Sequence, residues 1–344
     1  MLAVGVLMTV LLFVFANPLL RLFGAEDEAL ALSAEYARFI ALGAIFQVLA
    51  TGFVPFIRNM GGSSFAMVAM ILGFVTNIAL DYTLVWVVNW GMTGAALATV
   101  IGQAVTTVAA VLFLIIKKNK LRILAFGEWL ILCKEILKVA LSPFGLTFSP
   151  TVTMLLMNRF LLLYGNERSV AVCGCIGYIT SIIYLLLQGV GDGCQPLISY
   201  YYGEKNLALV KNTRRSAYIT ATIITVLCML GVFFARARVG ILFGASTNAN
   251  AGVIRYIPYF LATLLFLAFV RITTSYFYAT EKTALSYILV YAEPIFTLLF
   301  LLILPPLCKL TGVWSAVPLA QFATFVIAVI AYRYTERQAR SKSE

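Results

Sequence analysis

Histidine is absent from this 344-residue chain, and several motifs of enzyme chemistry are missing with it. Without imidazole, histidine-based metal sites and histidine acid–base catalysis are excluded. The chain also has no GxxxxGK[ST] phosphate loop, no DDxxD pair and no nucleophile elbow. The sequence therefore predicts a protein that is not an enzyme and that carries no cofactor.

Cysteine is scarce, and its spacing suggests neither a disulfide framework nor a redox pair. The six cysteines are scattered through apolar runs, and the only close pair has one residue between its members. We interpret all six as packing residues; they are Cys133, Cys173, Cys175, Cys194, Cys228 and Cys308.

Charge is the third scarcity, since only 11% of residues are charged while 62% are hydrophobic and the mean hydropathy is +0.97. A soluble domain cannot hide so much apolar surface, so lipid is the expected solvent. The apolar runs are continuous, which favours helices over the alternating strands of a β-barrel. The sequence predicts an all-α polytopic membrane protein with ten transmembrane helices, at residues 1–22, 36–57, 64–88, 92–116, 136–164, 168–190, 213–235, 254–278, 284–307 and 312–334.

The net charge of +11 is interpreted from where lysine and arginine fall relative to these runs. Most of them, including Arg214 and Arg215 at the start of the seventh run, lie in loops or at helix ends that ten crossings place on one side, and this side is typically cytoplasmic. We therefore expect a multi-pass protein of the bacterial plasma (inner) membrane with both termini cytoplasmic. The basic charge is then a topology signal and a contact with membrane lipids, and no nucleic-acid partner is expected.

An internal repeat organises the chain. The sequence LFGA occurs at residues 22–25 and again at 242–245, in the same helix–loop–helix context. Three predicted helices precede the second copy in its half, but only one precedes the first. Paired lobes are common in transporters, so we expect an incomplete 6+6 architecture lacking two helices, rather than a genuine 4+6 one. The predicted parts are an N-terminal lobe of four helices (1–116), an interlobe linker (117–131), a C-terminal lobe of six helices (132–334) and a cytoplasmic tail (335–344).

Three acidic residues in apolar runs are candidates for cation coupling, because an intramembrane carboxylate is costly without a function or a partner. Asp81 lies near Asn77, and a structural hydrogen bond between helices is equally consistent with the pattern. Glu293 precedes Pro294 in the ninth run, and a salt bridge to Arg271 or Arg159 is its alternative.

The third acidic candidate, Asp192, lies in a glycine-rich stretch that also contains proline. Such a stretch weakens a helix, and we favour a hinge over an ion ligand there. The predicted hinge residues are Gly189, Gly191, Gly193 and Pro196. Other polar residues are candidates for lining a cavity, although interhelical hydrogen bonding is their commoner role; they are Asn77, Gln47, Asn59, Asn158, Gln188 and Gln321.

Several longer segments resemble one transporter family. NIALDYTLV and GMTGAALATVIGQ resemble the end of the first-lobe pattern of the multidrug and toxic compound extrusion (MATE) family. LLLQGVGDGCQPLISYYYGEKN resembles its second-lobe counterpart. PFIRNMGGSSFAM, SPFGLTFSPTVTMLLMNRF and GVWSAVPLA are similar to the MepA-like bacterial branch, so that the resemblance covers nearly the whole chain.

This resemblance implies two six-helix lobes that export small organic cations in exchange for Na⁺ or H⁺ by alternating access, and we expect a monomer. It places Asp81 on the acidic position of the family's fifth helix and Asp192 on the GDG of its eighth. Two departures stand out: Gln321 replaces a usual acidic residue, and YAEP replaces a usual Arg-Gln pair. The alternatives are a flippase for lipid-linked oligosaccharides, or a truncated fragment without transport activity.

Overall fold

The computed structural model describes residues 1–22, 27–117, 126–242 and 247–341, and all regular secondary structure in these ranges is helical. The chain forms two compact units, Met1–Ile123 and Leu124–Glu344. The predicted all-α fold is thereby confirmed. Most of both LFGA copies, at residues 23–25 and 243–245, lies outside the described residues, as does part of the predicted linker.

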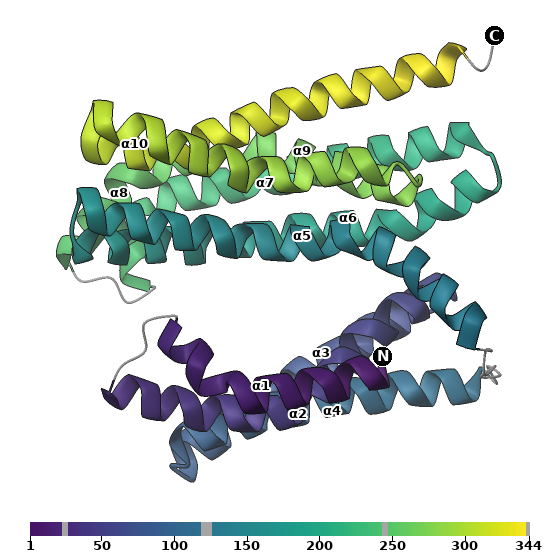
Figure 1. Ribbon diagram of the computed structural model, residues 1–344, viewed down its shortest axis with the longest axis horizontal. Coiled ribbons are helices and arrows are strands. Elements are labelled where there is room, and N and C mark those ends of the chain that lie inside the picture. Colours follow the sequence, from purple (N-terminus) through teal and green to yellow (C-terminus); the bar gives the residue numbers. More distant parts are fainter. Residues whose placement is uncertain (23–26, 118–125, 243–246, 342–344) are drawn as a thin grey trace. The chain divides into compact units, whose positions relative to one another are not determined.

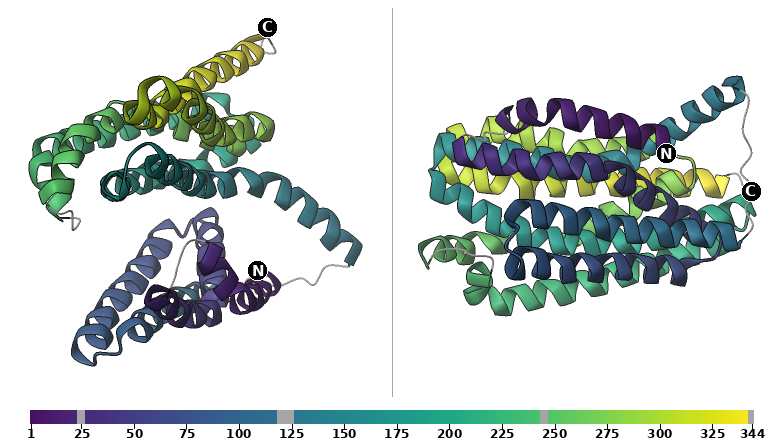
Figure 2. Two further views of the ribbon diagram at one scale, coloured as in Figure 1. Left: turned by 60° about the vertical axis from the view of Figure 1, so that its left-hand side comes forward. Right: turned by 90° about the horizontal axis from the view of Figure 1, so that it is seen from below.

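The first unit is a small helical bundle (Figure 1). Its elements are α1 (Leu2–Leu22), α2 (Asp27–Asn59), α3 (Ser63–Asp81), the π-helix η1 (Tyr82–Val87) and α4 (Gly91–Ile116). Helix α2 packs against α1, α3 and α4, and α3 packs along α4 (Figure 2). Small side chains such as Ala66 and Ala110 make up much of the buried surface, so the helices approach each other closely.

The second unit is larger, and its described residues form six elements. They are α5 (Phe126–Tyr164), α6 (Glu167–Gly203), α7 (Leu207–Leu242), α8 (Thr247–Leu261), α9 (Leu264–Ala279) and α10 (Thr283–Ser341). Asn166 caps the start of α6, since its Oδ1 accepts a hydrogen bond from the Ser169 amide at 3.0 Å.

Two breaks divide this unit into spans. Helices α8 and α9 meet at a 48° bend and together form one candidate span. Element α10 contains two helices joined at Lys309, whose φ of 50° and ψ of −132° are not helical. The chain turns back on itself at this kink (Figure 1), between the predicted runs 284–307 and 312–334.

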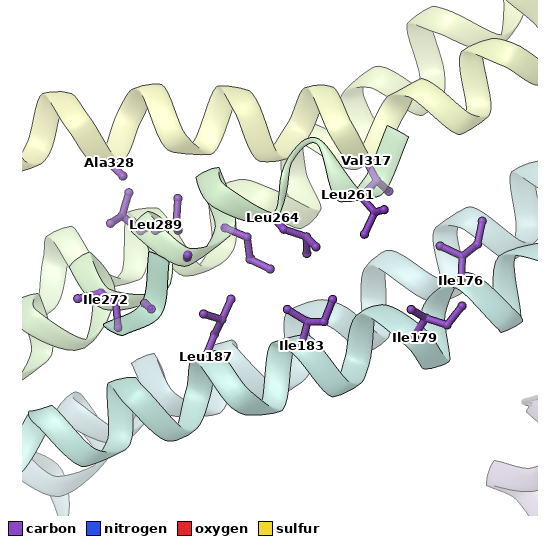
Figure 3. Packing of buried hydrophobic residues seen from close by; sticks show 14 of the residues in the cluster. Ile176, Ile179, Ile183, Leu187, Leu261, Leu264, Ile272, Leu289, Val317 and Ala328 are labelled. Carbon is purple, nitrogen blue, oxygen red and sulfur yellow. The ribbon is translucent and has the colours of Figure 1, made fainter. Parts of the chain in front are cut away.

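The core of the second unit takes buried side chains from all six elements, and Figure 3 shows the part between α6, α8, α9 and α10. Ile176, Ile179, Ile183 and Leu187 recur every three to four residues along α6, which places them on one helix face. In Figure 3 this face points toward side chains of the other three elements, including Leu264. The packing brings together segments that are far apart in the sequence.

Many of the large apolar side chains outside these cores point outward. Trp86 and Phe234 are 77% and 79% exposed, and in every candidate span at most 39% of the most apolar segment is buried. Among the described residues, eight helices are long and apolar enough to cross a membrane, and α8 with α9 can supply a ninth span. Because α10 consists of two helices, the number of spans becomes ten, which agrees with the ten predicted apolar runs.

The helices extend beyond the predicted runs at several places, and two of these extensions fall in the predicted linker and tail. Helix α5 begins at Phe126, ten residues before the predicted span and inside the predicted linker. Helix α10 continues to Ser341, through most of the predicted tail. Both extensions are more polar than the spans, so hydropathy alone did not assign them to a helix.

Candidate functional site

Glu293 lies in the first half of α10, inside the second unit, and two neutral groups hold its carboxylate. The Tyr184 hydroxyl on α6 donates a hydrogen bond to Oε1 at 3.1 Å. The Gln321 amide, from the second half of α10, donates to the same oxygen at 3.3 Å. These contacts join three helical segments at one carboxylate.

Gln321 extends this hydrogen-bond network to the α8–α9 bend. It is 7% exposed, and its Oε1 accepts a short hydrogen bond from the Thr263 hydroxyl at the bend. Its Nε2 also donates to the Tyr184 hydroxyl at 3.2 Å. Both ends of the buried amide are therefore satisfied, which keeps its orientation fixed.

Arg271 on α9 completes the group, which we call the Glu293 cluster: Tyr184, Thr263, Arg271, Glu293 and Gln321. Arg271 is 6% exposed, and its guanidinium lies 5.0 Å from the centre of the Tyr184 ring. Its Nη2 donates to the Leu146 carbonyl at 3.2 Å, while Nη1 is buried with no partner among the described residues. A permanent positive charge is thus enclosed against the ring of Tyr184, whose hydroxyl donates to the carboxylate.

Two prolines free backbone carbonyl groups around this cluster. Proline has no amide hydrogen, so it leaves the carbonyl four residues before it without a helical partner. Pro150 in this way frees the Leu146 carbonyl, which accepts from Arg271. Pro294 frees the carbonyl of Val290, which accepts a hydrogen bond from the Ser149 hydroxyl at 2.9 Å.

A polar seam between α6 and α9 continues away from the cluster. The Ser199 hydroxyl donates to the Ala279 carbonyl at 3.1 Å, and the Tyr278 hydroxyl donates to Ser275 at 3.3 Å. Asp192 is half-buried on α6 and lies close enough to Tyr278 to interact with it electrostatically, as does Arg271. Tyr278 on this seam therefore interacts with both Asp192 and Arg271.

The predicted hinge lies on this seam, and α6 passes through it as one uninterrupted helix. A Cβ added to Gly191 would lie 2.6 Å from the Ser275 hydroxyl oxygen, so this glycine allows α6 to approach α9. Gly189 and Gly193 are exposed, and a Cβ added at either position would meet no neighbour within 4 Å, while Pro196 is half-buried. The hinge stays a prediction.

The candidates in the first unit do not form a comparable cluster. Asp81 ends α3 and is half-buried, and the described residues provide no hydrogen bond or ion pair to its carboxylate. The Asn77 amide donates to the Thr99 hydroxyl on α4 at 3.5 Å, which is the interhelical role considered above. Gln47 and Asn59 are exposed on α2.

The other polar candidates lie on α5 and α6. Asn158 is half-buried, with its Oδ1 enclosed and unpartnered within the described chain. Gln188 is half-buried and lies one helical turn from both Tyr184 and Asp192, on the same face of α6. The alternative salt bridges of Glu293 are absent from the described structure, because Arg159 is exposed and Arg271 makes the contacts given above.

Sequence reasoning missed Tyr184 and Thr263 as members of the cluster. A signal for Tyr184 was present, because Tyr184, Gln188 and Asp192 follow each other at intervals of four residues. Thr263 had no such signal, since its position is defined by the α8–α9 bend.

The fold and this buried polar cluster define a polytopic helical membrane protein built from two bundles. A family model described as MatE matches residues 1–83 and 139–303. The chain belongs to the MatE family.

Relatives and solved structures agree with this assignment. The multidrug export protein MepA of Staphylococcus aureus is 29% identical over 237 residues, 67% of this chain and 51% of the relative. MepA of Staphylococcus saprophyticus is 26% identical and matches 100% of this chain and 76% of its own. The chain thus spans about half the length of the Staphylococcus aureus relatives that it matches.

Among solved structures, an outward-facing multidrug resistance MATE transporter has a TM-score of 0.87 at 24% identity, covering 99% of this chain and 76% of that one. A MOP superfamily transporter from Pyrococcus furiosus has a TM-score of 0.88 at 24% identity, covering 100% and 77%. These similarities establish the shared fold.

Proposed function

We propose that the chain is a secondary active antiporter, which exports small organic cations in exchange for Na⁺ or H⁺ by alternating access. The observation that carries the proposal is the Glu293 carboxylate, held inside the second unit by neutral donors and without an ion pair among the described residues. A carboxylate in a membrane span is costly, and a cation that binds there offsets this cost. The similarity to multidrug export proteins supports the same activity.

The roles of the other residues follow from their positions. Tyr184 and Gln321 hold the carboxylate in place, and Arg271 supplies a fixed positive charge nearby. Asp81 is a second candidate for cation coupling in the first unit, because its carboxylate is half-buried and unpaired among the described groups. Asp192 and the glycines around it serve as the hinge of α6.

Localisation and assembly complete the proposal. The protein functions as a monomer in the bacterial inner membrane, with both termini in the cytoplasm. The bias of lysine and arginine toward one set of loops supports this orientation.

Organic cations are preferred to lipid-linked sugars as substrates for a specific reason. A flippase for polyanionic lipids needs a strongly basic cavity, and the sequence offers only Arg159, Arg255 and Arg271 within or near the apolar core. Arg271 is buried and contacts Leu146 and Tyr184, so its charge is not displayed on an open surface of the second unit.

The test is uptake of a fluorescent organic cation such as ethidium by proteoliposomes under an imposed cation gradient. We expect the Glu293→Gln variant to lose the gradient-driven component and to keep only the passive leak. Glu135→Gln is the matched control, because Glu135 is an exposed carboxylate on α5 away from the cluster. The proposal fails if the parent protein shows no gradient-driven uptake, or if both variants transport alike.

A further inference from the structure

The buried guanidinium of Arg271 affects which cation can bind at Glu293. Arg271 is 6% exposed, and its Nη1 has no hydrogen-bond partner among the described residues. Arginine stays protonated under all ordinary conditions, so this charge is permanent. The second unit therefore holds a cation of its own, which is linked to the Glu293 carboxylate through Tyr184.

Tyr184 links the two opposite charges. The face of its ring lies 5.0 Å from the guanidinium carbon, and its hydroxyl donates to Glu293 at 3.1 Å. Both charges interact with Tyr184 electrostatically. Because an apolar bundle screens charges poorly, Arg271 opposes the binding of any further cation at the carboxylate, and a weakly bound ion such as Na⁺ is lost before a covalently bound proton.

The hydrogen-bond directions around Glu293 suit a proton better than a metal ion. Oε1 accepts from both Tyr184 and Gln321, and the Gln321 oxygen already accepts from Thr263. Sodium needs several oxygen lone pairs pointing at one centre, and here the lone pairs of these groups point at hydrogens. A proton can bind the remaining oxygen, Oε2, without rearrangement of these contacts.

Two carbonyl oxygens of the helix break next to the cluster are already used in backbone hydrogen bonds. Transporters often bind Na⁺ through carbonyls that a broken helix releases. At the α8–α9 bend, the Phe260 carbonyl accepts from the Thr263 amide at 3.2 Å. The Pro258 carbonyl accepts from the Ala262 amide at 3.1 Å.

We propose that Arg271 acts as a fixed internal cation that excludes Na⁺ from Glu293 and reserves this carboxylate for a proton. The other charged or titratable groups near the pair are Tyr184 and Asp192 on α6 and Tyr278 on α9, while α5 contributes the Leu146 carbonyl. The inference rests on the proposed antiport and specifies its ion at this site.

The first experiment measures ²²Na⁺ binding to the purified protein, which does not require transport. We expect no saturable binding that depends on Glu293 in the parent protein. Saturable binding that the Glu293→Gln variant removes would overturn the proposal.

Substitutions at Arg271 then test the selectivity role directly. Arg271→Met removes the charge, and we expect it to gain saturable, Glu293-dependent ²²Na⁺ binding, on the order of tenfold or more above the parent's background. Arg271→Lys keeps the charge and should not gain it. Arg271→Gln, which keeps a polar side chain, replaces the methionine variant if thermal unfolding shows that the latter does not fold. If no folded neutral variant gains sodium binding, Arg271 is not the selectivity residue.

The last experiment compares two gradients in proteoliposomes. A proton gradient in sodium-free potassium buffer should drive ethidium uptake, and a sodium gradient at equal pH on both sides should drive none above the leak. If the sodium gradient drives uptake and Glu293→Gln abolishes that uptake, Na⁺ binds at Glu293. The proposal of a proton at this site is then wrong, while the proposed antiport stands. Uptake under neither gradient refutes the proposed function, and the binding experiments then still decide whether Arg271 excludes Na⁺.

Discussion

The contact between Arg214 and Glu336 gives the sharpest prediction about stability. Arg214 is at the start of α7 and is 4% exposed, and its Nη2 lies 2.7 Å from Glu336 Oε1 near the end of α10. It also donates to the Tyr332 hydroxyl at 3.1 Å, and its guanidinium lies 4.6 and 4.8 Å from the ring centres of Tyr276 and Tyr332. One side chain thus joins α7, α9 and α10.

The perturbation is Arg214→Met, which preserves much of the volume and removes the charge. The charge-assisted hydrogen bond contributes about 1.5–3 kcal/mol, and each cation–π contact about 0.5–2 kcal/mol. The carboxylate left behind is 30% exposed, so water partly compensates it. We expect a loss of about 3 kcal/mol in the free energy of unfolding for Arg214→Met, and about 1–2 kcal/mol for Glu336→Gln.

The assay is reversible denaturant unfolding of the purified protein in detergent, with both single variants and the double variant. Because the two residues are in contact, the cycle should give a coupling energy of about 1–2 kcal/mol. Arg215→Met is the matched control, since Arg215 is the exposed neighbour and should change stability by no more than about 0.5 kcal/mol. The reasoning is refuted if Arg214→Met is as mild as this control, or if the coupling is negligible.

Two further substitutions test packing in each unit by the same unfolding assay. A methyl group on Gly73 would lie 2.1 Å from the Thr106 hydroxyl oxygen, so Gly73→Ala should cost about 1–3 kcal/mol. Gly174→Ala, in open space on α6, is its control and should not destabilise; equal effects would contradict the close α3–α4 approach. Trp314 is fully buried and stacks on Tyr256 at 4.3 Å, but its Nε1 has no partner among the described groups. Trp314→Phe should therefore cost much less than Trp314→Ala, which should cost about 3–5 kcal/mol, and similar losses would show that Nε1 is in fact satisfied.

The polar residues of the site could be predicted from the sequence, but the contacts between them could not. Glu293 and Gln321 were both selected from the sequence, because polar groups in apolar runs are conspicuous. Their contact was not predicted, since 28 residues and the Lys309 kink separate them. Arg271 was considered as an ion-pair partner of Glu293, whereas the described structure directs its Nη2 to the Leu146 carbonyl instead.

The sequence prediction for Arg214 was wrong in one respect, because it assigned this side chain a contact with lipid. From its position at the start of the seventh run, next to Arg215, Arg214 was counted among the basic residues that indicate topology and contact lipid. The structure buries Arg214 against two tyrosines and Glu336 and leaves Arg215 exposed. Adjacent residues on a helix point about 100° apart, so only the packing of α7 decides which of the two faces the bundle.

The sequence by itself determined the solvent, the helical fold, the approximate spans and the family resemblance. These follow from local hydropathy and from motifs contiguous in the chain, because lipid requires every backbone hydrogen bond to be made within a helix. Only the tertiary structure decided which polar groups meet. A helix specifies the faces of its own residues, but the partner of each face is set by the crossing of several helices. The Glu293 cluster, with members on α6, α9, α10 and the α8–α9 bend, exists only after those helices have packed.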